Sequence, residues 1–110
     1  MTNFEMVQEF HKALGTADAP IILRLMLLVD EVKELTDAIA EGDKAHILKE
    51  VCDVLYLAHG VGMCTGGDVD EAFKRVHESN MLKTVEPLYR KDGKLLKGPN
   101  YVAPTLEDLV

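Results

Sequence analysis

The chain has 110 residues, of which 47% are hydrophobic, so its length and composition suit one folded domain. Aromatic residues make up 5% and Trp is missing, which favours aliphatic helix packing over an aromatic-rich β fold. The net charge of −7 argues against nucleic acid as a partner, and no apolar run is long enough to cross a membrane. The first ten residues lack the basic and apolar regions of a secretory signal, so we expect a cytoplasmic protein.

Helix start and stop signals divide residues 1–83 into four segments. Thr2 and Glu5 have the spacing of a capping box, and Gly15 is a stop signal for the helix that follows. Pro20 suits the first turn of the second helix, and Gly42 ends it. The predicted helices cover residues 3–14, 20–41, 44–64 and 69–83. Their short connections indicate an all-α four-helix bundle in a single domain, residues 1–110.

The pattern changes in the tail, residues 84–110. The dipeptide Asp92-Gly93 is a strong tight-turn signal and predicts a small hairpin. Pro99 and Pro104 then favour extended backbone. A segment of this kind buries little surface alone, so we expect an extended or hairpin tail that wraps the bundle or a neighbouring subunit.

Two carboxylate pairs have i, i+3 spacing on consecutive predicted helices: Glu31 with Glu34, and Glu50 with Asp53. None of the four acids has a basic residue four positions later, where an acid on a solvated helix face often has its partner. Four carboxylates gathered inside a small bundle would repel one another, and a bound divalent cation removes that repulsion. Oxygen ligands suit Mg²⁺, with Mn²⁺ as a possible alternative. The sequence therefore predicts a metal site.

Helical wheels predict which faces are buried. The second helix has an apolar stripe centred on Leu28, with Glu31 at its border, and the third has a similar stripe bordered by Glu50. Asp53 falls farther outward. The residues expected in the two stripes are Ile21, Leu25, Leu28, Val32, Leu35 and Ile39 on the second helix, and Ile47, Val51, Val54, Leu55 and Ala58 on the third.

The predicted fourth helix adds complementary chemistry. Phe73, Val76, Asn80 and Lys83 recur at helical spacing, which extends its inward stripe to an amide and an ammonium group. Both groups can bind phosphate oxygens. Residues 83–97 contain five basic residues against two acidic ones. This segment suits a small polyanion, provided that a cation bridges the polyanion to the acidic part of the chain.

With these residues the chain resembles the MazG-type all-α nucleoside triphosphate pyrophosphohydrolases. That superfamily includes dimeric dUTPases and phosphoribosyl-ATP pyrophosphohydrolases, and its signature is EExxE, a spacer, and ExxD. Residues 30–34 read Asp-Glu-Val-Lys-Glu, fifteen residues follow, and residues 50–53 read Glu-Val-Cys-Asp. Asp30 departs from the first Glu of the signature, but it faces away from the core on the wheel. Residues 80–83, Asn-Met-Leu-Lys, resemble the phosphate-contacting stretch of the fourth helix.

The resemblance implies a magnesium-dependent hydrolase that cleaves between the α- and β-phosphates and releases a nucleoside monophosphate and pyrophosphate. It also implies a homodimer or homotetramer, with base contacts from the first helix, where Phe10 and His11 are the candidates. The implied site residues are the metal ligands Glu31, Glu34, Glu50 and Asp53, the catalytic residues Glu34 and Glu50, and the substrate-binding residues Asn80, Lys83, Lys94 and Lys97. Glu34 is the preferred general base or water-orienting group.

The sequence suggests three alternatives, of which the second is disfavoured. Phosphoribosyl-ATP pyrophosphohydrolase has the same fold and reaction with a biosynthetic substrate. A di-iron carboxylate bundle requires a Glu-x-x-His motif, which the chain lacks. A non-catalytic helical interaction module could retain the fold, and it would neither bind magnesium nor be stabilised by it.

Overall fold

The computed structural model describes residues 1–110 and contains four α-helices, a small hairpin and a final 3₁₀ turn. The elements are α1 (Asn3–Leu14), α2 (Ile21–Glu41), α3 (Lys44–Met63), α4 (Val69–Leu82), β1 (Leu88–Tyr89), β2 (Leu95–Leu96) and η1 (Glu107–Leu109). The predicted all-α class, with a hairpin in the tail, is confirmed. The chain forms two compact units, Met1–Gly67 and Asp68–Val110, and each has its own packing.

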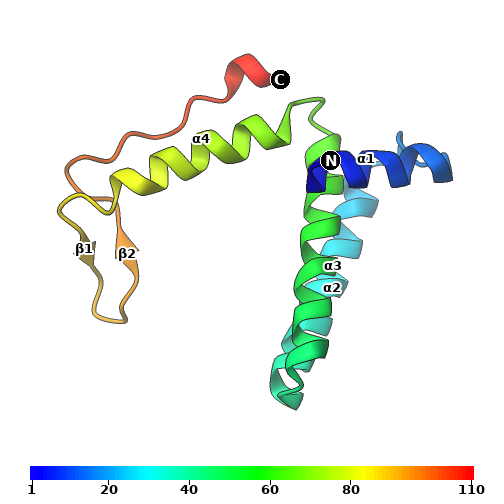
Figure 1. The fold of residues 1–110 in the computed structure, drawn as a ribbon, viewed down its shortest axis with the longest axis horizontal. Coiled ribbons are helices and arrows are strands. Elements are labelled where there is room, and N and C mark those ends of the chain that lie inside the picture. The colour runs from blue at the N-terminus through cyan, green and yellow to red at the C-terminus, as the bar shows by residue number, and fades with distance from the viewer. The chain divides into compact units, whose positions relative to one another are not determined.

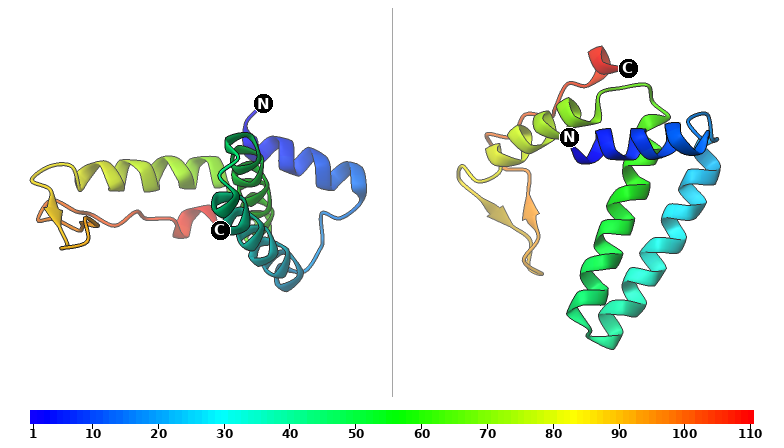
Figure 2. Two further views of the ribbon diagram at one scale, coloured as in Figure 1. Left: turned by 90° about the horizontal axis from the view of Figure 1, so that it is seen from below. Right: turned by 45° about the vertical axis from the view of Figure 1, so that its right-hand side comes forward.

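In the first unit, α2 and α3 lie side by side as an antiparallel helical hairpin, and α1 packs across α3 (Figure 1, Figure 2). The turn of this hairpin follows from two residues. Gly42 has a φ of 80°, a left-handed conformation that ends α2, and the Asp43 side chain accepts the backbone N–H of Ala45 to start α3. This short turn holds the two helices antiparallel and brings the acid pair of α2 opposite the acid pair of α3.

The faces that pack inside the hairpin differ from the predicted stripes. On α2 the least exposed side chains are Arg24, Leu28, Glu31, Leu35 and Ala38, and on α3 the packed positions include Glu50, Val54, Leu57 and Val61. The predicted burial was wrong for the exposed residues Ile21, Leu25, Val32, Ile39, Val51, Leu55 and Ala58. The apolar arc of each helix is wider than the strip that one neighbouring helix can cover. Glu31 therefore lies on the packed face itself instead of at its border.

Arg24 ties the linker after α1 to the hairpin. Its guanidinium is buried and donates hydrogen bonds to the carbonyl oxygens of Gly60 (2.5 Å), Thr16 (2.8 Å) and Ala17 (3.1 Å). No carboxylate neutralises this buried charge, so backbone dipoles provide its stabilisation. Arg24, which interrupts the apolar run of residues 21–29, thus has a structural role.

In the second unit, the tail runs back alongside α4 (Figure 1). Strands β1 and β2 pair in antiparallel register, and Gly93 takes a φ of 91° in the turn between them, as the Asp-Gly dipeptide predicts. Farther on, Ser79 Oγ donates to the Val102 carbonyl at 2.5 Å, and Arg75 Nη1 donates to Asp108 Oδ1 at 2.7 Å. These contacts hold the end of the chain against α4.

The face of α4 that meets the tail is not the predicted inward stripe. Arg75 and Ser79 meet the tail, whereas Phe73 is 72% exposed and Asn80 is also exposed. The expectation of an inward stripe through Phe73 and Asn80 was therefore wrong for this unit taken by itself. Polar contacts through Arg75 and Ser79 determine how the tail packs, and hydrophobic spacing cannot reveal them.

None of the helices combines the length and the apolar composition that crossing a bilayer requires.

Candidate metal centre

Three of the four predicted metal ligands converge between α2 and α3. Glu31 comes from α2, and Glu50 and Asp53 come from successive turns of α3. One carboxylate oxygen from each of the three lies within 4.8 Å of the others. Such close carboxylates repel one another, and a single cation could contact all three of them.

Burial makes this cluster costly without a positive partner. Glu50 is 3% exposed, although acidic residues rarely lie that deep in a fold. The Oε2 atoms of Glu31 and Glu50 are buried and have no hydrogen-bond partner. A buried oxygen that accepts no hydrogen bond destabilises the folded protein, because it has given up its hydrogen bonds to water. Coordination to a cation would offset that cost. The orphaned oxygens therefore fit a hard divalent ion.

The pKa of Glu31 also reflects this crowding. It is raised to about 7, chiefly because the protonated carboxyl hydrogen-bonds to Glu34. Burial adds to the rise, as do the negative charges of Glu34 and Asp53 and a hydrogen bond with Glu50. Without a cation, the cluster thus holds a proton near neutral pH that an isolated glutamate would release.

Two basic residues of α3 lie beside these acids. Lys49 Nζ is 2.6 Å from Asp53 Oδ2, and His46 Nε2 is 3.3 Å from Glu50 Oε1. The pKa of His46 is raised, first by its hydrogen bond to Glu41 and then by the charges of Glu41 and Glu50. Each basic residue stands four positions before its acid in the sequence, whereas the acids lack a basic residue four positions after them. The i−4 position therefore identifies His46 and Lys49 as partners of Glu50 and Asp53.

Glu34 has a different environment from the other three predicted ligands. It is exposed and lies outside the three-residue cluster, and it is the group to which the protonated carboxyl of Glu31 hydrogen-bonds. It lines an open groove of about 350 Å³ together with Asp37, Glu41, His46 and Glu50. Because four of the five lining residues are acids, a phosphate substrate would be repelled unless a cation were present.

Comparison with known proteins gives the family. Residues 5–80 match the phosphoribosyl-ATP pyrophosphohydrolase family. The chain belongs to that family. Because the family is part of the MazG-like superfamily of nucleoside triphosphate pyrophosphohydrolases, the resemblance drawn from the acid motif is confirmed. The matched segment runs from α1 through the acidic cluster to the last turn of α4.

A curated relative extends the comparison to a larger protein. Uncharacterized protein L479 of Acanthamoeba polyphaga mimivirus is 33% identical over an alignment that takes in 63% of this chain. The same alignment takes in 33% of the viral protein, so the chain spans about a third of that relative's length.

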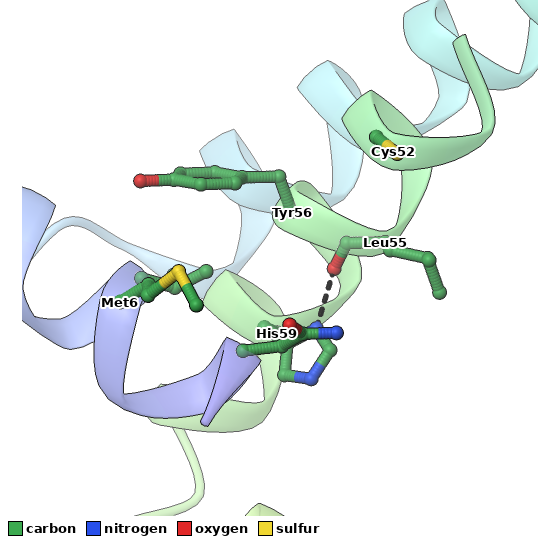
Figure 3. Close-up of a pocket in the computed structure, with 7 residues that line it drawn as sticks. Met6, Cys52, Leu55, Tyr56 and His59 are labelled. Atoms are coloured by element: carbon green, nitrogen blue, oxygen red, sulfur yellow. Dashed lines mark hydrogen bonds between the residues drawn. The ribbon is translucent and has the colours of Figure 1, made fainter. Parts of the chain in front are cut away.

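A second cavity in this family member lies between α1 and α3 (Figure 3). It holds about 130 Å³ and is lined by Asn3, Met6, Val7, Cys52, Leu55, Tyr56 and His59. Phe10, a predicted base contact, packs edge-on against Tyr56 with ring centroids 5.6 Å apart. His11, the other candidate, is half-buried, and its Nδ1 lies 2.8 Å from Thr16 Oγ1. Base contact by these two residues stays a prediction.

The predicted phosphate-binding residues all belong to the second unit. Asn80 and Lys94 are exposed. Lys83 and Lys97 each place their ammonium group over the ring of Tyr101, at 5.4 and 5.1 Å from its centroid. Sequence reasoning assigned no role to Tyr101. The joint action of these residues with the acidic cluster of the first unit stays a prediction.

Proposed function

We propose that this protein is a nucleoside triphosphate pyrophosphohydrolase that requires a divalent cation, Mg²⁺ by preference and Mn²⁺ as the alternative. It hydrolyses the bond between the α- and β-phosphates and releases a nucleoside monophosphate and pyrophosphate. The observation that carries this proposal is the convergence of Glu31, Glu50 and Asp53 within 4.8 Å between α2 and α3. Membership of a pyrophosphohydrolase family supports the same class of reaction.

The acidic cluster suits a hard cation in both charge and donor type. Glu31, Glu50 and Asp53 offer carboxylate oxygens, two of which lack hydrogen-bond partners, and Glu34 completes the proposed ligand set. When bound, the cation offsets the charge of the triphosphate and polarises its phosphoryl oxygens.

The side chains of the protein divide the remaining tasks. Glu34 is exposed in the groove and linked to Glu31, so it orients a water molecule and accepts a proton from it as that water attacks phosphorus. Glu50 is the second catalytic residue and lies at the buried centre of the cluster. The phosphates are held by amide and ammonium groups of the second unit, namely Asn80, Lys83, Lys94 and Lys97.

The test is pyrophosphate release from a panel of ribonucleoside and deoxyribonucleoside triphosphates with millimolar Mg²⁺. We expect equal amounts of monophosphate and pyrophosphate from at least one substrate, and no turnover when a chelator removes the metal. Release of inorganic phosphate alone would show cleavage at a different bond. A folded protein that releases no pyrophosphate from any member of the panel would favour the non-catalytic module.

Phosphoribosyl-ATP is the second candidate substrate, because the matched family carries that description. It belongs in the same panel at the same concentration. A turnover rate far above that of every simple nucleoside triphosphate would assign the protein to the biosynthetic reaction, with the same acidic cluster.

We also propose that the protein works as a homodimer or homotetramer. The support is the apolar surface that the hairpin leaves exposed, including Leu25 and Val32 of α2 and Leu55 of α3, each 44–47% exposed. A second copy can cover such a face, since exposed apolar surface favours association.

Light scattering should give a mass of two or four chains, and Leu25→Glu should shift it toward one chain. The exposed-site variant Lys33→Glu is the control, and a wild-type monomer at micromolar concentration would contradict the proposal.

A further inference from the structure

Two lysines of the second unit share one aromatic ring. Lys83, just after α4, and Lys97, just after β2, place their ammonium groups 5.4 and 5.1 Å from the centroid of the Tyr101 ring. Both distances fall within the range at which a cation is attracted to the face of an aromatic ring. The two ammonium groups can therefore be no farther apart than the sum of these two distances. Two charges of the same sign repel each other, and the attraction of each ammonium group to the ring offsets part of that repulsion.

The local backbone builds this arrangement. The Tyr101 backbone N–H donates to the Gly98 carbonyl at 3.2 Å, which closes a turn between Lys97 and Tyr101. Asn100 Nδ2 donates to the Val85 carbonyl, and a Cβ on Gly98 would lie 3.2 Å from the Glu86 carbonyl oxygen. Glycine thus lets the tail approach the chain that follows α4 closely. This turn and its anchor place the centroid of the Tyr101 ring within 5.4 Å of both ammonium groups.

Neither lysine has a carboxylate partner. The ion pairs of the second unit join Arg75 to Glu71 and Asp108, and Arg90 to Asp92. Lys83 and Lys97 have no contact of this kind, although the chain as a whole has a net charge of −7. Two ammonium groups held beside one ring, without carboxylate partners, offer complementary charge to a ligand with several adjacent negative oxygens.

We propose that Tyr101 is a positioning residue that gathers Lys83 and Lys97 into a binding site for a diphosphate group. The ligand class is a chain of two or more phosphates, because two separate ammonium groups are matched better by adjacent phosphates than by one. In the reaction proposed above, on which this assignment rests, the diphosphate is the leaving pyrophosphate. The tail thereby binds a ligand and does more than cover α4.

The test is calorimetric titration of the full chain with inorganic pyrophosphate in a chelator, so that no divalent ion links the ligand to the acidic cluster. Tyr101→Leu should weaken binding about five-fold or more, since both cation–π contacts are lost. Tyr101→Phe keeps the ring and should stay within about two-fold of wild type. Lys97→Gln should weaken binding without altering the ring. Tyr89→Leu, at a 61% exposed position of β1, is the matched control and should bind as wild type does.

Equal affinity of Tyr101→Leu and wild type would overturn the proposal, as would pyrophosphate binding no tighter than monophosphate binding. If Tyr101→Phe is as weak as Tyr101→Leu, the hydroxyl matters and the ring-based role is wrong. If Tyr101→Leu loses helical content, the proposal is tested by the affinity of Lys97→Gln for pyrophosphate, and an affinity equal to that of wild type would overturn it. Nucleotide turnover is measured separately. Turnover without Tyr101-dependent binding removes only this inference, and Tyr101-dependent binding without turnover removes only the proposed reaction.

Discussion

Replacing Glu50 by Gln should lower the rate of pyrophosphate release by about 100-fold or more. Glu50 is 3% exposed and supplies an oxygen to the three-residue cluster, so the amide removes a charge from its centre while keeping the shape of the side chain. Gln also has a helix propensity close to that of Glu, so α3 should form normally. The measurement is pyrophosphate release with Mg²⁺, together with helical content from circular dichroism.

The control for this variant is Asp30→Asn. Asp30 is exposed, lies next to Glu31 in the sequence and is not a member of the cluster, so the same chemical change there should leave turnover within about two-fold of wild type. Equal rates for Glu50→Gln and the wild-type protein would end the assignment of the catalytic site. A large loss in Asp30→Asn would instead show that general negative charge on α2 matters more than the cluster.

Adding Mg²⁺ should raise the melting temperature of the protein, and the rise should be larger at pH 8 than at pH 5. A ligand that binds only the folded chain stabilises it by about 2.7 kcal/mol when its concentration is one hundred times its dissociation constant. The pKa of Glu31 rises from 4.5 to about 7 on folding. The stability contributed by its bound proton is therefore full below about pH 4.5 and is lost as the pH rises through about 7. Metal-free protein should accordingly melt at a lower temperature at pH 8 than at pH 5.

Thermal melts at the two pH values, with and without Mg²⁺, test this prediction. Glu31→Gln cannot ionise at that position, so the pH dependence of the metal-free protein should shrink in this variant. If no divalent ion, Mn²⁺ included, shifts the melting temperature at pH 8, the acidic residues do not form a metal site. A wild-type melting temperature that increases from pH 5 to pH 8 without metal would contradict the raised pKa of Glu31.

The errors in the predicted burial have one common cause. Wheels locate the hydrophobic arc of a helix, but Leu25 and Val32 belong to that arc and remain exposed, whereas Arg24 is buried. A charged residue can be buried when backbone carbonyls accept its hydrogen bonds. The spacing of hydrophobic residues in the sequence does not show where those carbonyls lie. The same reason explains why the packed face of α4 runs through Arg75 and Ser79.

Local sequence patterns predicted the helices, their order and the acidic motif. Capping residues and glycines act over a few positions, so Thr2, Asp43 and Gly42 place helix ends without knowledge of the rest of the chain. Which of these acids meet depends on the packing of the helices. Glu31, Glu50 and Asp53 converge while Glu34 faces the groove, because that division depends on how α2 is rotated against α3. Helix rotation is set by packing across the whole interface, and local sequence patterns leave it free.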